Sequence, residues 1–95
     1  MIRVVAKFNL KAGAKPEAMP LFEELIGKTR KEDGCGGYDL GQATQDENQL
    51  VVLEAWESKE ALDAHSASEH FTRIVPQLVA MCTEPPSIDS FIQIV

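Results

Sequence analysis

The stretch LVVLEAWESKEALDAHSASEHF, residues 50–71, passes from a strand pattern into a helix pattern. Its first part, Leu50 to Trp56, is apolar on both faces, which is typical of a central strand covered on both sides. Ser58 then predicts a helix N-cap, and SASE (residues 66–69) offers a capping box eight residues later. Two helices are therefore expected to meet near His65.

The residues before this stretch predict a strand, a helix and a further strand. Ile2 to Leu10 alternates apolar and polar residues, which is the period of a strand. Pro16 opens a helical pattern that ends before Gly34 and is bent or delayed at Pro20. Apolar residues at helical spacing carry this pattern: Ala18, Leu21, Phe22, Leu25 and Ile26. Tyr38–Thr44 is the next strand, joined to the central strand by a polar hairpin at residues 45–48.

The residues after this stretch predict a second helical region and a last strand. The helical pattern continues from Ile74 through Pro76, which should kink or divide the helix. Ile88–Val95 alternates again and forms the last strand. The order β-α-β-β-α(α)-β predicts one α+β domain over residues 1–95, a ferredoxin-like βαββαβ sandwich. Because the sheet face without helices also carries apolar residues, a second copy is expected to pack there, sheet against sheet.

Composition excludes several functions. The net charge of −6 and a pI near 4.8 oppose binding to nucleic acid or to an anionic membrane surface. Residues 1–11 carry three cations and no apolar run long enough for a signal peptide or a membrane span. A cytoplasmic location is therefore expected.

Four polar or aromatic residues are candidates for chemistry. His65 could act as a base near neutral pH or lie on a helix surface. Trp56 ends the central strand and belongs either to the core or to a pocket, where its indole N–H needs an acceptor. Asn9 interrupts the first strand and is satisfied by solvent or by a pocket. Glu54 is an acid on an apolar strand and needs a partner or water.

The two histidines do not have the spacing of a known metal motif. HSASEH differs from the H-x-x-E-H zinc signature by one residue. His65 and His70 would also lie about 140° apart around a continuous helix. No metal is expected, and Tyr38 and Phe71 are most simply core residues.

Three segments resemble the antibiotic-biosynthesis and quinol monooxygenase family of dimeric α+β barrels. They are Asn9 near the end of the first strand, EDGCGGYDL (residues 32–40), and above all EAWESKEALDAHSASEHF (residues 54–71). The resemblance covers nearly the whole chain. It implies a homodimer in which two ferredoxin-like sheets form a barrel, with a pocket between each sheet and its helices.

The resemblance also implies a reaction and a set of residues. Members oxygenate small electron-rich aromatics, such as quinols or polyphenols, with O₂ and without a cofactor. His65, Asn9 and Trp56 match the polar positions of the pocket, as base and oxyanion donors. The neighbouring positions are expected to contact substrate: Tyr38, Glu54, His70 and Phe71.

Other functions remain open at this stage. Haem-degrading relatives share Asn, Trp and His at similar positions, with the His as iron ligand, although this acidic chain has no evident basic pair for the haem carboxylates. A third branch isomerises small phosphorylated metabolites, for which Arg3, Lys7 or Lys11 could supply the cation. A dimer that binds aromatic ligands without turnover is the fourth reading.

Overall fold

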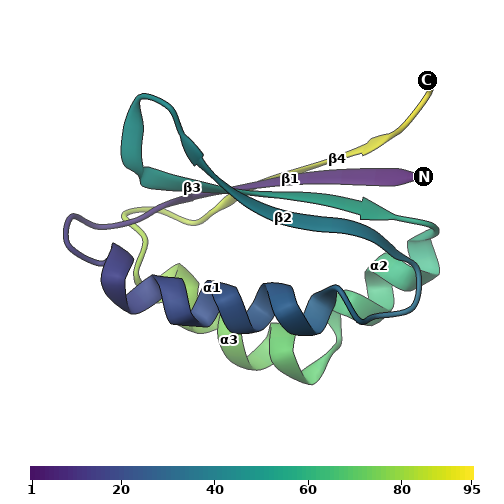
Figure 1. The fold of residues 1–95 in the computed structure, drawn as a ribbon, viewed down its shortest axis with the longest axis horizontal. Coiled ribbons are helices and arrows are strands. Elements are labelled where there is room, and N and C mark those ends of the chain that lie inside the picture. Colours follow the sequence, from purple (N-terminus) through teal and green to yellow (C-terminus); the bar gives the residue numbers. More distant parts are fainter.

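Four antiparallel strands form one sheet in the order β2-β3-β1-β4, and three helices cover one of its faces (Figure 1). The computed structural model describes residues 1–95. In chain order the elements are β1 (Ile2–Asn9), α1 (Lys15–Thr29), β2 (Cys35–Ala43), β3 (Asp46–Trp56), α2 (Lys59–Ser66), α3 (Glu69–Ala80) and β4 (Ser87–Ile92). The ferredoxin-like α+β prediction is confirmed, with β3 as a central strand.

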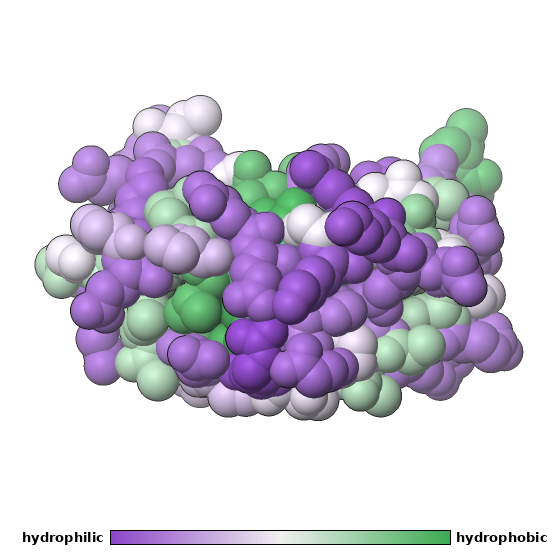
Figure 2. Space-filling view, turned by 60° about the horizontal axis from the view of Figure 1, so that its bottom comes forward, coloured by the Kyte–Doolittle hydropathy of each residue, from purple (hydrophilic) through white to green (hydrophobic).

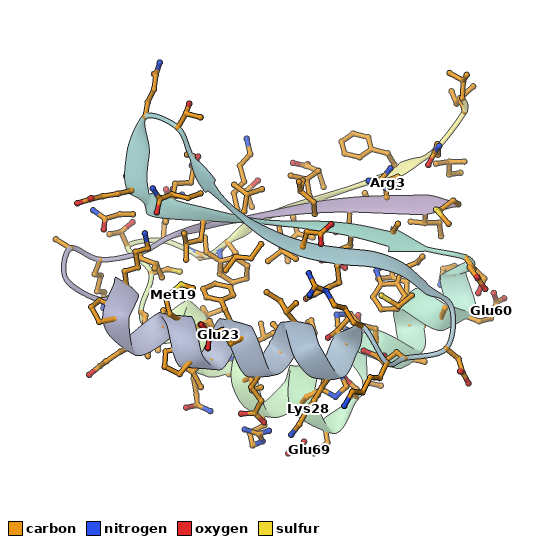
Figure 3. The ribbon with its side chains drawn as sticks, in the orientation of Figure 1. Arg3, Met19, Glu23, Lys28, Glu60 and Glu69 are labelled. Atoms are coloured by element: carbon orange, nitrogen blue, oxygen red, sulfur yellow. The ribbon has the colours of Figure 1, made fainter.

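The register of the sheet decides which side chains meet under the helices. In β1 and β3 the buried residues are even-numbered, apart from Ala55, and Ile2 pairs with Trp56. Tyr38 of β2 pairs with Glu54 of β3 on the same face. In Figure 3, Met19 of α1 points toward the sheet, whereas Arg3 lies on the sheet face away from the helices. The odd-numbered residues of β1 therefore occupy this open face.

Several element boundaries differ from the sequence prediction. Helix α1 runs through Pro20, and α3 runs undivided through Pro76, which lies on its exposed side and so loses only one solvent-facing hydrogen bond. The predicted capping box at residues 66–69 is wrong: Ser68 is the N-cap of α3 and accepts from the Phe71 N–H at 3.3 Å. The N-cap at Ser58 is confirmed, since its hydroxyl accepts from the Ala61 N–H at 3.1 Å.

The core lies between the sheet and the helices. Phe22 and Leu25 of α1 and Ile74 and Leu78 of α3 are at most 1% exposed and pack on the buried face of the sheet. An ion pair between Glu24 and Arg73, together with hydrogen bonds, joins the outer sides of α1 and α3. Figure 2 shows this helix side as mostly hydrophilic, with small hydrophobic areas. None of the helices is both long and apolar enough to cross a membrane.

Strand β4 and the C-terminal residues expose apolar side chains. All six residues of β4 are exposed, and β4 forms an edge of the sheet. The large exposed apolar residues of this region are Ile88, Phe91, Ile92, Ile94 and Val95. The C-terminus extends beyond the sheet in Figure 1. Leu53, on the open face of β3, is 45% exposed. No helix covers this residue or the apolar side chains of β4 and the C-terminus.

Candidate functional site

His65 is the buried polar residue at the centre of the site. It lies in the last turn of α2 and is 1% exposed. Its ring centroid lies 4.7 Å from that of Trp56, 5.2 Å from Tyr38 and 5.0 Å from Phe71. Its Nε2 atom is buried and has no hydrogen-bond partner within the chain. Since buried polar atoms are normally paired, this nitrogen is available for a further interaction.

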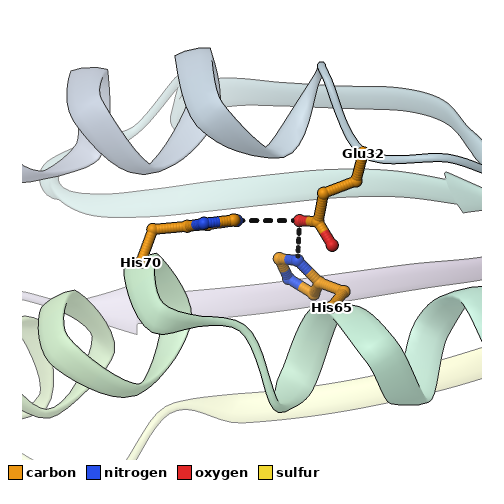
Figure 4. A group of neighbouring side chains, drawn as sticks. All are labelled: Glu32, His65 and His70. Atoms are coloured by element: carbon orange, nitrogen blue, oxygen red, sulfur yellow. Dashed lines mark hydrogen bonds and ion pairs between the residues drawn. The ribbon is translucent and has the colours of Figure 1, made fainter.

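Glu32 binds both histidines through one oxygen atom (Figure 4). Its Oε2 lies 2.7 Å from His65 Nδ1 and 2.8 Å from His70 Nε2. The three side chains come from three segments: the turn between α1 and β2, the end of α2, and the start of α3. Their exposure rises outward, from 2% for the His65 side chain to 14% for His70 and 16% for Glu32.

The break between α2 and α3 brings the two histidines together. The angular separation expected from the sequence assumed a continuous helix, but α2 ends at Ser66 and α3 begins at Glu69. The Ser68 hydroxyl bonds the His65 carbonyl at 2.7 Å and also caps α3, which fixes the angle between the helices. Sequence reasoning missed Glu32 because a contact across 33 residues leaves no periodic signal. Its place just before the glycine turn at Gly34 was the available hint.

Trp56 and Glu54 form a second buried pair beside His65. The indole N–H donates to Glu54 Oε1 at 2.9 Å. Glu54 is 7% exposed, and burial raises the pKa of its carboxyl, while the hydrogen bond from Trp56 opposes that rise. The sequence predicted that the Trp56 N–H needs an acceptor and that Glu54 needs a partner or water. The structure pairs these two residues with each other.

Burial also sets the charge state of the rings. It lowers the pKa of His65, and the hydrogen bond that His65 donates to Glu32 opposes that change only in part. Burial is the main cause that raises the pKa of the Tyr38 phenol, and the charge of the nearby Glu54 raises it further. At neutral pH the site therefore holds a neutral imidazole next to a protonated phenol.

Asn9 lies away from this cluster. It sits at the opposite end of β1 from Ile2, the residue that pairs with Trp56, and its odd position places it on the open face. Its side chain accepts from Gln49 at 2.9 Å and donates to Glu84 at 3.1 Å. The structure thus brings together six of the seven predicted site residues and places Asn9 elsewhere; the six are Tyr38, Glu54, Trp56, His65, His70 and Phe71.

Glu32, His65 and His70 are also the residues that could hold a metal ion. Their ligand atoms lie within 4.8 Å of one another, and two imidazoles with one carboxylate suit zinc or iron. A histidine bound to metal normally donates its other ring N–H to an acceptor, but His65 Nε2 has none in the chain. The two short contacts to one oxygen also have hydrogen-bond lengths. The geometry therefore favours a hydrogen-bonded cluster.

An open cleft of about 500 Å³ adjoins the site between α2 and the β1–β4 edge. It is lined by Ile2, Lys59, Leu62, Ser90, Phe91 and Ile92. Ile2 pairs with Trp56, and Leu62 precedes His65 by about one helical turn. The inner end of this cleft is therefore close to the buried rings.

Comparisons with known proteins agree with this fold and cover the site. The sequence model of a family described as "Antibiotic biosynthesis monooxygenase" matches residues 1–77. The chain is 33% identical over 87 residues to "Putative monooxygenase Rv0793" of Mycobacterium tuberculosis, covering 92% of this chain and 85% of that protein. A solved structure described as an antibiotic biosynthesis monooxygenase matches with a TM-score of 0.95 and 36% identity over 100% of both chains. A conserved protein from Methanosarcina mazei Go1 matches with a TM-score of 0.93 and 37% identity, over 95% of this chain and 89% of that one.

The match over residues 1–77 includes the whole buried cluster, from Glu32 to Phe71. The chain belongs to the antibiotic biosynthesis monooxygenase family. The resemblance found in the sequence is thereby confirmed.

Proposed function

We propose that the chain is a monooxygenase that oxidises a small electron-rich aromatic, a quinol or polyphenol, with O₂ and without a bound cofactor. The observation that carries this proposal is the buried, unpartnered Nε2 of His65 among three aromatic rings. Family membership and the name of the Mycobacterium tuberculosis relative support the class of reaction.

The substrate can supply every electron that this reaction needs. A quinol with a free ring position reacts with O₂ to give a hydroxyquinone and water. One oxygen atom replaces a ring hydrogen, the other leaves as water, and the substrate provides all four electrons. Loss of a phenolic proton makes the first electron transfer to O₂ easier, so the protein's main task is to supply a base and a dry pocket.

His65 is the proposed base. Its burial lowers the pKa, which keeps the imidazole neutral at pH 7 and able to accept a proton. Tyr38 and Phe71 hold the ring from two sides and exclude water. Trp56 contributes its ring face, because its N–H is already bound to Glu54; a role as oxyanion donor would require that bond to exchange.

The cleft between α2 and β4 is the proposed approach for substrate. Its walls are mainly apolar and include Ile2, Leu62 and Ile92, which suits an aromatic ring. His65 is enclosed in this structure, so Leu62 or Ile2 must shift for substrate to reach Nε2. Substrates should accordingly be small and planar.

A homodimer is part of the proposal. The open sheet face and β4 expose apolar residues that a monomer would leave in water, including Leu53 and Phe91. A second copy packed on this face would cover them and close the two sheets into a barrel.

The alternative functions have less support from the geometry. Haem is much larger than a quinol, so its iron could reach His65, which is 1% exposed, only after a wider opening than a shift of Leu62 or Ile2. Arg3, which a phosphorylated substrate could bind, lies on the open sheet face and not beside His65.

Oxygen uptake with a panel of quinols and polyphenols tests the proposal. The full chain should consume O₂ with at least one of them, and the product should contain one oxygen atom from ¹⁸O₂. His65→Gln keeps a polar side chain of similar size but cannot take the proton, so the rate should fall by about 10² to 10⁴. Ser66→Ala, on the exposed side of the same helix, is the matched control and should keep the parent rate. An equal rate in His65→Gln would refute the role of His65, and a saturable haem spectrum without oxygen uptake would favour the haem branch.

A further inference from the structure

We propose that Glu32 is the positioning residue of this site: it holds His65 in the tautomer that carries its proton on Nδ1, and His70 fixes Glu32 through the same oxygen. The inference rests on the proposed function for its kinetic consequence. The tautomer itself can be measured without any turnover.

The hydrogen-bond pattern determines the tautomer. An ionised carboxylate has only acceptors, so both nitrogens that contact Glu32 Oε2 must donate. A neutral imidazole has one N–H. If the N–H of His65 is on Nδ1, the lone pair is on Nε2. Nε2 is the nitrogen that lies among the aromatic rings without a partner. The free lone pair is what a base needs.

Two donors on one oxygen explain how a glutamate in a turn can act as a fixed support. Glu32 lies outside the helices and strands, and its side chain has several rotatable bonds. His65 approaches its Oε2 from α2 and His70 approaches it from α3 (Figure 4). His70 is in turn placed by the first turn of α3, which Ser68 caps. Glu32 therefore cannot move without breaking contacts to two helices.

The carboxylate also stabilises the charge that the reaction creates. When His65 takes a proton on Nε2, it becomes an imidazolium with its Nδ1–H on Glu32, 2.7 Å away. The other titratable groups next to His65 are His70 and Tyr38, and Glu54 is bound to Trp56, whose ring lies against His65. Glu54 is occupied by Trp56, and the Tyr38 phenol stays protonated, so Glu32 is the one group that hydrogen-bonds the His65 ring.

The first arm of the test is long-range ¹H–¹⁵N NMR of the full chain at pH 7.5. The chain has only two histidines, so four ring nitrogens give the whole pattern. The parent should show a protonated Nδ1 and an unprotonated Nε2 for His65. A parent with the proton on Nε2 would overturn the proposal, whether or not any substrate is oxidised.

The second arm compares variants at Glu32. Glu32→Ala removes the acceptor, and Glu32→Met removes it while keeping a side chain of similar length, in case the alanine variant does not fold. In either variant the amount of the Nε2–H tautomer should rise and the pKa of His65 should fall below that of the parent, since Glu32 raises it. Glu23→Ala, an exposed glutamate on α1, is the matched control and should leave both signals unchanged. An unchanged His65 tautomer in folded Glu32→Met and Glu32→Ala would refute the positioning role.

The third arm measures kcat and KM with a quinol that the parent oxidises. Glu32→Ala should lower kcat by about 10² to 10⁴ with little change in KM, because the residue acts on the base and does not touch substrate. His70→Leu should lower kcat by about tenfold, whereas His70→Gln, which retains a side-chain N–H donor, should recover most of it. If no quinol is oxidised, the proposed function fails while the NMR arms still decide the role of Glu32. Full activity in a Glu32→Ala protein with the altered tautomer would overturn the kinetic part.

Discussion

The Trp56 indole N–H donates to Glu54 Oε1 at 2.9 Å, although the two residues lie on the same face of one strand. Neither side chain reaches solvent to any useful extent: Trp56 is 0% exposed and Glu54 is 7% exposed. The hydrogen bond therefore pairs two buried polar groups, the indole N–H and the carboxyl, and without it both would lack a partner.

Trp56→Phe should lower the free energy of unfolding by about 2–5 kcal/mol. About 1–3 kcal/mol comes from leaving Glu54 without its donor, and the rest comes from the smaller ring. Glu54→Gln should change it by less than about 1 kcal/mol, since the amide oxygen still accepts. Urea unfolding of the single and double variants gives the coupling energy, which should be at least about 0.5 kcal/mol. A coupling near zero would show that the hydrogen bond contributes nothing.

Burial of His65 predicts a loss of stability in mild acid. Because its pKa is lower in the folded chain than the ordinary value of about 6.5, the unfolded chain binds more protons between these two values. The stability that neutral His65 provides is complete above pH 6.5 and declines as the pH falls toward the lower pKa. Urea unfolding between pH 7.5 and pH 5 should show this decline in the parent and a smaller one in His65→Gln. An equal slope in both proteins would assign the acid sensitivity to other groups.

The position of Asn9 predicts a mild effect on catalysis. Asn9 bonds Gln49 and Glu84 on the open sheet face, so Asn9→Ala should keep kcat within about threefold of the parent. It should cost about 0.5–1.5 kcal/mol of stability per lost hydrogen bond at most, since the residue is half-exposed. Steady-state oxygen uptake by Asn9→Ala, measured in parallel with the parent and His65→Gln, checks this prediction. A loss as large as that of His65→Gln would support the catalytic role that the family resemblance implies.

Local patterns predicted the elements well, whereas contacts between distant segments were beyond them. The alternation in β1 and the N-cap at Ser58 depend on a few neighbouring residues, which the sequence displays directly. Pro76 does not divide α3 as the sequence suggested. A proline on the exposed side of a packed helix destabilises it less than the burial of Ile74 and Leu78 stabilises it. Glu32 contacts His65 only because the turn after α1 lies beside the end of α2 in the folded chain. No rule of sequence spacing predicts that contact.

The exposed apolar residues of the open face predict a dimer that one charge should disrupt. Leu53 is 45% exposed at the middle of the central strand β3, so Leu53→Asp should place a carboxylate in the proposed interface. Light scattering after size exclusion should show a dimer for the parent and a monomer for Leu53→Asp. Val79→Asp changes an apolar residue of α3 with a similar exposure, 37%, and should leave the dimer intact. A parent that is monomeric at micromolar concentration would contradict the dimer.

Gly34 allows the turn that carries Glu32 to pass close to α2. Its φ is +81°, and an added Cβ would lie 2.6 Å from the Ala61 Cβ. Gly34→Ala should therefore cost about 1–2 kcal/mol for the backbone conformation and about 1–3 kcal/mol for the clash. Because the turn also positions Glu32, the same variant should alter the NMR signals of His65.

Ala61→Gly separates the two costs of that substitution. It removes the methyl group that Gly34→Ala would meet, so the clash should disappear in the double variant while the backbone cost remains. Urea unfolding should show that Gly34→Ala destabilises the Ala61→Gly background by about 1–2 kcal/mol only, less than it destabilises the parent. Strictly additive effects would mean that the turn moves away from α2 at little cost, and Glu32 would then have to be held in place by its two histidines alone.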